Sequence, residues 1–425
     1  MIKSMTNDSN SVNKIHRFSN GMTLISESMP WCQSVSCSIL VPAGSNHDPE
    51  ERLGLAGLTC EMMLRGAGEY DSRRLIEAFE NLGSERSESA ANMHTTFSAA
   101  MLDSMFPQTL AVLADIVRRP HFPDEQLDAA KLVIEQEIIS VEDDPSRKVM
   151  IELGRNFLPA PWGHPGTGTL ESIAQITTAD IKKFHERFFQ PNGMIISVAG
   201  KFDWAQLTED IERLFGDWQP QELPLIAESP PGTETMHIPY DSAQTHIGLA
   251  YQQAPFRHPD YLPAWGAVNI LSGGMSSRLF TEIREKRGLC YSVGASYFSF
   301  RDHAGVTCYC GTSADRAQES LDVLIGELSR ISDGVTEKEV ELLKIRAKSS
   351  LVMQQESTSA RAGSIARDWY HLQRIRPMSE IIDKVNALTR QRLNEHLAQN
   401  RIKQLWLATI GPEPLVMPSP TGSFL

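Results

Sequence analysis

The chain is organised around one short apolar stretch that has glycine at both ends. It reads Gly54-Leu55-Ala56-Gly57-Leu58-Thr59-Cys60-Glu61-Met62-Met63-Leu64-Arg65-Gly66. Its apolar residues recur at the spacing of one helix face, so the stretch predicts a buried helix. In such a helix, positions three and four residues apart are neighbours. Positions 57, 60 and 61 therefore share a face, and they hold Gly57, Cys60 and Glu61.

Length and composition limit the class of protein. The chain has 425 residues, which suggests two or three domains, and it carries a net charge of −13. An acidic chain without a long basic run is a poor candidate for binding nucleic acid or an anionic membrane surface. No stretch approaches the length of a membrane span, and the first thirteen residues lack the apolar core of a secretory signal. We therefore expect a cytoplasmic protein.

The cysteines show no metal-binding spacing. There are six of them, and no pair forms Cys-x-x-Cys. Cys308 and Cys310 alternate within a strand-like run, so both should face one side of a sheet. Reduced thiols in a protein core are the simplest interpretation.

Apolar periodicity and turn residues place the elements of the first half. An Asn20-Gly21 turn joins two strands within residues 17–25. Further strands are expected at 34–41, 94–101 and 194–199, and further helices at 73–82, 106–118, 123–141 and 177–189.

Three segments of the first half return in the second half. They are 109–113 with 320–324, 122–127 with 335–340, and 176–181 with 388–393. All three return in the same order, each about 212 residues later, which indicates an internal duplication. The segment 219–235 carries prolines and no apolar period, so we interpret it as a linker. The prediction is an α+β fold of two homologous domains, 1–218 and 236–425, each a mixed sheet flanked by helices.

Four stretches resemble the M16 (pitrilysin-like) peptidase family, especially its shorter two-domain members. They are 54–66, 110–137, 162–192 and 273–293, and the last, from Gly273-Gly274-Met275 to Tyr291-Ser292-Val293, is the most specific. The resemblance implies a pair of α+β domains, and two such subunits that enclose a chamber in which peptides are bound and cut.

The resemblance also implies where a zinc site would lie. Active members carry His-x-x-Glu-His on the first helix and a distal glutamate, which hold zinc and supply the general base. In this chain the two histidines are replaced by Gly57 and Glu61, and the base by Cys60. The distal ligand position keeps Glu137, and a further glutamate position holds Ala130.

These positions allow two interpretations, a rebuilt metal site or the loss of the site. Cys60, Glu61 and Glu137 offer one sulfur and two carboxylates, which zinc accepts. However, no histidine pair has the spacing of one helical turn, and no carboxylate stands at the base position. We therefore expect no metal in this chain, with Cys60 as a core residue and the two glutamates as solvated or hydrogen-bonded carboxylates.

The resemblance also implies other functional positions of the family in this chain. The substrate-edge pair of the family falls near Ser87-Glu88, which departs from the family pattern. The arginine and tyrosine that bind the substrate carbonyl match Arg284 and Tyr291. A guanidinium and a phenol are suitable donors to such an oxygen. In the alternative interpretation, Arg284 pairs with Glu282 or Glu285 on a charged helix face, and Tyr291 is a strand aromatic.

Three functions follow from these residues. The favoured one is a non-catalytic subunit of a heterodimeric zinc peptidase, which supplies Arg284, Tyr291 and half of the peptide chamber to a zinc-bearing partner. The second is a peptide-binding or scaffold homodimer without a proteolytic role. The third is an autonomous peptidase with an unorthodox metal site at residues 60, 61 and 137.

Overall fold

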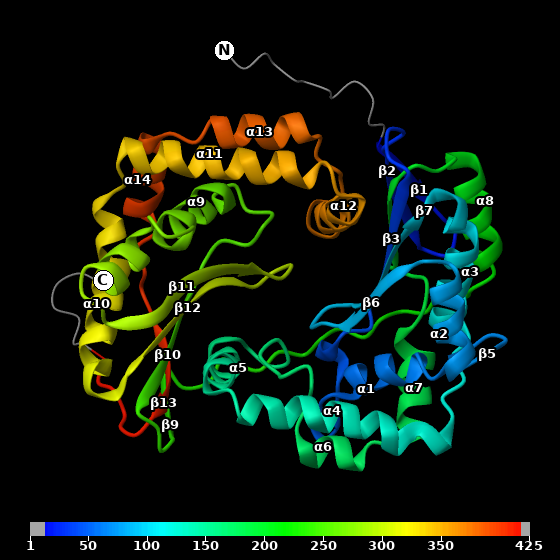
Figure 1. Cartoon of the computed structure of the whole chain (residues 1–425), viewed down its shortest axis with the longest axis horizontal. Coiled ribbons are helices and arrows are strands. Elements are labelled where there is room, and N and C mark those ends of the chain that lie inside the picture. The colour runs from blue at the N-terminus through cyan, green and yellow to red at the C-terminus, as the bar shows by residue number, and fades with distance from the viewer. Residues whose placement is uncertain (1–12, 418–425) are drawn as a thin grey trace. The chain divides into compact units, whose positions relative to one another are not determined.

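Each half of the chain builds a mixed β-sheet that is covered by helices, in a computed structural model that describes residues 13–417 (Figure 1). The chain divides into two units. Unit 1 takes its residues from the ranges up to 139, 164–227 and 352–378, and unit 2 from 140–163, 228–351 and 379 onward. The prediction of two homologous α+β domains is confirmed.

Unit 1 contains a six-stranded sheet in the order β1-β2-β8-β3-β7-β6. Its strands are β1 (Asn13–Arg17), β2 (Thr23–Ser28), β3 (Ser34–Val41), β6 (Glu85–Ala90), β7 (Thr95–Leu102) and β8 (Ile195–Gly200). All neighbours are antiparallel except β2 and β8, which run parallel. The predicted turn at Asn20-Gly21 joins β1 to β2, and the predicted strand at 34–41 is β3. Strand β6 lies at one edge of the sheet.

The helices of unit 1 follow the predicted order. Those that it takes from the first half of the chain are α1 (Leu55–Met63), α2 (Ser72–Asn81), α3 (Phe106–Arg118), α4 (Leu127–Glu142), α6 (Leu170–Gln175), α7 (Thr178–Phe188) and α8 (Trp204–Phe215), with a short hairpin of β4 (Gly66–Ala67) and β5 (Tyr70–Asp71). Helix α7 begins with a capping box in which Thr177 and Asp180 bond each other's backbone N–H, as its sequence predicts.

Unit 2 contains a five-stranded sheet in the order β11-β12-β10-β13-β9. Its strands are β9 (Thr235–Pro239), β10 (Gln244–Gln252), β11 (Cys290–Ser299), β12 (Ala304–Ser313) and β13 (Trp406–Gly411). Its helices are α9 (Tyr261–Ser272), the π-helical turn η5 (Phe280–Glu285), α10 (Ala317–Arg330), α11 (Glu337–Gln354), α13 (Met378–Asn386) and α14 (Arg390–Gln399). The long hairpin of β11 and β12 forms one edge (Figure 1). Cys308 and Cys310 are buried on one face of β12, as predicted.

All strands of the unit 1 sheet except β1 have a counterpart in the sheet of unit 2. The order β2-β8-β3-β7-β6 of unit 1 corresponds to β9-β13-β10-β12-β11 of unit 2. The three sequence echoes lie on corresponding helices: α3 with α10, the start of α4 with that of α11, and α7 with α14. The internal duplication is therefore visible in both layers of the fold.

One helix from each half belongs to the other unit, so the units differ from the sequential ranges 1–218 and 236–425. Helix α5 (Pro145–Phe157) packs on the sheet of unit 2, and α12 (Thr358–Leu372) packs on the sheet of unit 1. The apolar face of α5 enters a cluster with Trp406, and that of α12 enters a cluster with Ile25 and Ile195. An amphipathic pattern shows that a helix has a face to bury, but not which sheet will cover it.

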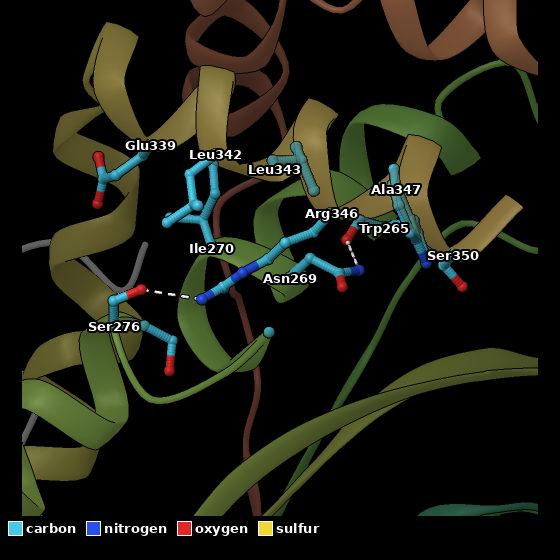
Figure 2. A pocket seen from close by; sticks show the side chains of 12 residues that line it. Trp265, Asn269, Ile270, Ser276, Glu339, Leu342, Leu343, Arg346, Ala347 and Ser350 are labelled. Carbon is cyan, nitrogen blue, oxygen red and sulfur yellow. Dashed lines mark hydrogen bonds between the residues drawn. The ribbon is translucent and has the colours of Figure 1, made fainter. Parts of the chain in front are cut away.

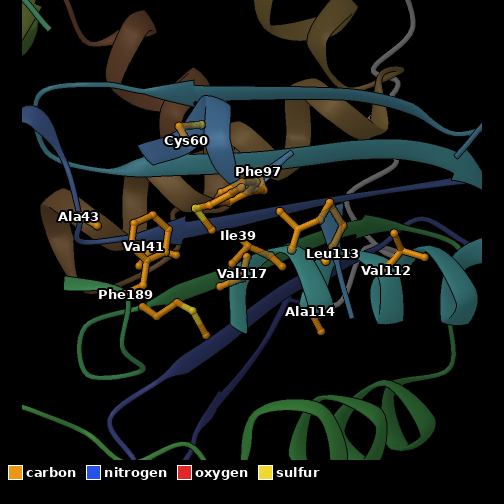
Figure 3. Packing of buried hydrophobic residues seen from close by; sticks show 14 of the residues in the cluster. Ile39, Val41, Ala43, Cys60, Phe97, Val112, Leu113, Ala114, Val117 and Phe189 are labelled. Atoms are coloured by element: carbon orange, nitrogen blue, oxygen red, sulfur yellow. The ribbon is translucent and has the colours of Figure 1, made fainter. Parts of the chain in front are cut away.

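The core of unit 1 lies between its sheet and α1, α3 and α7. Phe97, Ile39 and Cys60 belong to this single cluster (Figure 3). Within the described residues, no helix is both long and apolar enough to cross a membrane.

Three histidines of unit 1 are held neutral by burial. Burial lowers the pKa of His47, His94 and His185 from 6.5 to about 4. A neighbouring Arg187 adds to the effect at His47, and His371 and His47 add to it at His94. Each ring also packs against an aromatic ring. The ring of His94, for example, lies edge-on to that of Tyr370, with 4.8 Å between the ring centroids.

We expect these histidines to make unit 1 less stable in acid. Between pH 6.5 and about 4 the unfolded chain binds protons that the folded chain does not, so the free energy of unfolding falls as the pH falls. Each histidine contributes up to about 1.4 kcal/mol per pH unit. Denaturant unfolding of wild type and His94→Gln between pH 7.5 and 5 measures this, and the variant should show the shallower slope. If the free energy of unfolding of wild type and variant depends equally on pH, His94 does not contribute to the loss of stability in acid.

Candidate functional site

Helix α1 is fixed at its start by a buried carboxylate. Asp48 accepts the backbone N–H of Gly54 at 2.8 Å and that of Ala56 at 2.9 Å. Burial raises the pKa of Asp48 to about 7, although these N–H bonds favour its charged form. Gly54 has φ +89°, a conformation that favours glycine. The predicted helix is therefore present and anchored, with Leu64 as its last capping residue.

A side chain at position 57 would press on the backbone of Gly166. A Cβ atom at this position would lie 3.2 Å from the carbonyl oxygen of Gly166. The loop that contains Gly166 thus passes close over the helix at the point where active family members carry their first histidine. The absence of a side chain at 57 permits this approach.

The surroundings of Cys60 and Glu61 do not favour metal binding. Cys60 is buried, and burial raises the pKa of its thiol to about 12, with the charges of Glu88 and Glu61 adding to the rise. Glu61 accepts from Arg65 one turn later, with 3.0 Å between Nε and Oε1. Burial therefore disfavours the thiolate that a metal would require, and the carboxylate of Glu61 is already paired.

The remaining positions of the family's site do not complete it. Glu137 is exposed on α4, and Ala130 is fully buried in the core. Over the described range 13–417, no group of three His, Cys, Asp or Glu side chains is placed to hold a metal ion. The residues present therefore do not fit the family's zinc.

The substrate-edge positions lie on β6, the outer strand of the unit 1 sheet. Ser87 is exposed, whereas Glu88 lies on the other face and pairs with Arg86 at 2.5 Å. The guanidinium of Arg86 lies 5.1 Å from the ring centroid of Phe79. The outer edge of β6 has no neighbouring strand in the sheet order of unit 1.

Arg284 and Tyr291 lie side by side on the surface of unit 2. Arg284 comes from the turn η5, and its Cζ atom is 5.4 Å from the ring centroid of Tyr291 and 4.9 Å from that of Phe280. Tyr291 falls where the pairing of β11 and β12 shifts between Cys290 and Ser292. This irregularity releases Tyr291 from the ladder, and its side chain is 85% exposed. Both donors therefore face solvent together.

The ion-pair alternative for Arg284 is not what the structure contains. Glu282 pairs instead with Lys286 at 2.6 Å and with Arg287 at 2.9 Å. Among the described residues, no carboxylate forms an ion pair with Arg284. The sequence predicted a role for both residues but not the shifted pairing that exposes Tyr291. A pattern of alternation cannot locate such a shift, because it depends on the partner strand.

The profile described as "Insulinase (Peptidase family M16)" matches residues 23–157, and "Peptidase M16 inactive domain" matches residues 175–346. An uncharacterized zinc protease, YmxG, of Bacillus subtilis is 28% identical over 396 residues, which is 92% of this chain and 97% of that protein. A similar protein of Rickettsia felis is 26% identical over 376 residues, 88% of this chain and 91% of its own.

Solved structures share the fold along nearly the whole length. A peptidase M16 inactive domain from Pseudomonas fluorescens superposes with a TM-score of 0.87 at 21% identity, covering 96% of this chain and 100% of that one. A protease from Helicobacter pylori gives a TM-score of 0.85 at 17% identity, covering 94% and 99%. Together with the two matching profiles, these similarities show that the chain belongs to the M16 peptidase family.

Proposed function

We propose that this chain is the non-catalytic subunit of a heterodimeric zinc peptidase. Its partner would carry the zinc and the general base. This chain would supply Arg284, Tyr291 and half of the wall of the peptide chamber. The observation that carries the proposal is the contrast between the two candidate sites: the ligand positions on α1 do not fit a metal, whereas Arg284 and Tyr291 lie exposed beside each other.

The pair has the chemistry that a peptide carbonyl requires. A guanidinium and a phenol are both hydrogen-bond donors, and Arg284 is not engaged by a carboxylate of the described chain. Donors aimed at the carbonyl oxygen stabilise the charge that develops on it during attack. In this role the chain's residues bind and orient the peptide, and no proton transfer is assigned to them.

The edge strand β6 supports a peptide-binding role. An extended peptide adds to the free edge of a sheet through backbone hydrogen bonds, which tolerate many side chains. Glu85, Ser87 and Ser89 alternate as exposed residues along β6, so its pleat presents one polar face. A peptide on this strand would be held mainly through its backbone.

The proposal is tested by isolating the partner. The chain is purified from its native source, the bound protein is identified, and the two are recombined from separately purified forms. Peptide cleavage should appear only in the mixture, and zinc should be found in the partner. A stable homodimer with no peptidase partner would instead favour the peptide-binding or scaffold function. Stoichiometric zinc in this chain that is lost in Glu61→Ala would favour the autonomous peptidase.

A further inference from the structure

A pocket of about 250 Å³ lies in unit 2 between α9 and α11, beside the loop Gly273–Ser277 (Figure 2). Ile270 and Leu342 contribute an apolar wall. Ser276 and Arg346 contribute polar atoms. The pocket therefore offers an apolar surface and a positive charge within the volume of a small ligand.

The guanidinium of Arg346 is held in place by the glycine-containing loop. Its Nη2 atom donates to Oγ of Ser276 at 2.9 Å (Figure 2). Gly274 has φ +154°, and a Cβ atom there would lie 2.9 Å from the same Nη2 atom. The loop backbone thus packs directly against the guanidinium, and the φ of Gly274 favours glycine at this position. The charge in the pocket is positioned by the fold.

The charge of Arg346 is not neutralised by any carboxylate that the structure describes. The one carboxylate among the lining residues, that of Glu339, binds Arg278 with Nε–Oε1 at 2.6 Å and Nη2–Oε2 at 3.0 Å. Burial opposes ionisation of Glu339, but the bonds from Arg278 and Thr336 hold its pKa below the usual value. Arg346 forms no ion pair with any carboxylate of residues 13–417. An anionic ligand would therefore find an uncompensated donor.

We propose that this pocket binds the C-terminal carboxylate of a peptide whose last side chain is apolar. A single guanidinium with adjacent hydroxyl groups matches the charge and the two oxygens of one carboxylate. A phosphate dianion would require a second positive charge, which the pocket lining lacks. The apolar wall accommodates the last side chain. The same chemistry exists in a free N-acyl amino acid, and the binding requires no other subunit, so it stands apart from the function proposed above.

The test compares a free acid with its amide. Binding of acetyl-Ala-Ala-Leu and of its C-terminal amide to the full chain is measured by titration calorimetry. The acid should bind at least tenfold more tightly, because the amide cannot form the charge-assisted bonds. N-acetyl-leucine distinguishes a peptide C-terminus from a free N-acyl amino acid as the ligand. If it binds as tightly as the tripeptide, the ligand is a free small carboxylate, and if it binds more weakly, the ligand is the end of a peptide.

Variants of the pocket decide the outcome. Arg346→Gln should weaken binding of the acid by about tenfold to 100-fold and leave binding of the amide unchanged. Ser276→Ala, at an exposed position that does not pack the core, should weaken it by about threefold to tenfold. Arg287→Gln is the matched control, because it removes a guanidinium outside the pocket. The proposal is overturned if acid and amide bind alike, if neither binds, or if both pocket variants retain wild-type affinity.

Discussion

In the complex with a zinc-bearing partner, Arg284→Ala is expected to lower kcat/KM for peptide cleavage by about 10²–10³-fold. The guanidinium is exposed and lies beside the rings of Phe280 and Tyr291, and no carboxylate of residues 13–417 pairs with it, so it is available to a substrate carbonyl. The oxygen of that carbonyl gains charge in the transition state. A donor aimed at it therefore stabilises the transition state more than the bound substrate.

Two further substitutions separate charge from geometry. Arg284→Lys keeps the charge but loses the planar fork, so we expect partial activity. Tyr291→Phe removes one donor and keeps the ring beside Arg284, and should cost about tenfold. Steady-state kinetics of each reconstituted complex measure these losses as differences in transition-state stabilisation.

The matched control lies on the same segment. Arg287→Ala removes an exposed guanidinium that is already bound to Glu282, so kcat/KM should stay within about twofold of wild type. Gel filtration confirms that each variant still assembles with the partner. If Arg284→Ala assembles and cleaves as well as wild type, the shared-site role of this chain is rejected.

The parts of the fold that depend on local pattern could be predicted from the sequence. The Asn20-Gly21 turn, strand β3 and helix α3 follow from turn chemistry and apolar period. Strand β6 could not be found in this way, because Glu85–Ala90 is almost entirely polar and is paired only by β7. Its place is set by the partner strand rather than by its own residues.

The candidate site was predictable to a similar extent. The resemblance proposed Arg284 and Tyr291 as a pair, and their spacing alone did not show that the two would meet. They meet because η5 is a π-helical turn and because the pairing of β11 shifts at Tyr291. The approach of Gly166 to Gly57 is likewise a contact between distant segments. Features of this kind depend on tertiary packing, which periodicity does not report.

Arg361→Met is expected to destabilise unit 1 by about 3–5 kcal/mol. Arg361 on α12 binds Glu27 on β2, with Nε 3.1 Å from both carboxylate oxygens and Nη2 2.5 Å from Oε2. The two side chains are only 3% and 9% exposed. Removal of the guanidinium would leave the charge of Glu27 buried and unpaired, and this uncompensated charge causes most of the loss.

The pair also holds a helix that comes from the other half of the chain. Helix α12 is further joined to the sheet by a hydrogen bond between the hydroxyls of Thr358 and Ser36 at 2.8 Å, and by one that the Ser197 hydroxyl donates to the carbonyl of Ala362 at 2.7 Å. Hydrogen exchange of the β8 amides, which lie under α12, reports the stability of unit 1 directly. We expect protection of these amides to fall in Arg361→Met.

A double variant distinguishes the cost of an unpaired charge from the value of the pair. In Glu27→Leu/Arg361→Met both charges are absent, so most of the lost stability should return. Arg73→Met is the control, since its pair with Glu77 is largely exposed and should change stability by less than about 0.5 kcal/mol. If Arg361→Met costs no more than Arg73→Met, the buried pair does not anchor α12. If the double variant is as unstable as Arg361→Met, the loss comes from packing of the arginine stem and not from the unpaired carboxylate.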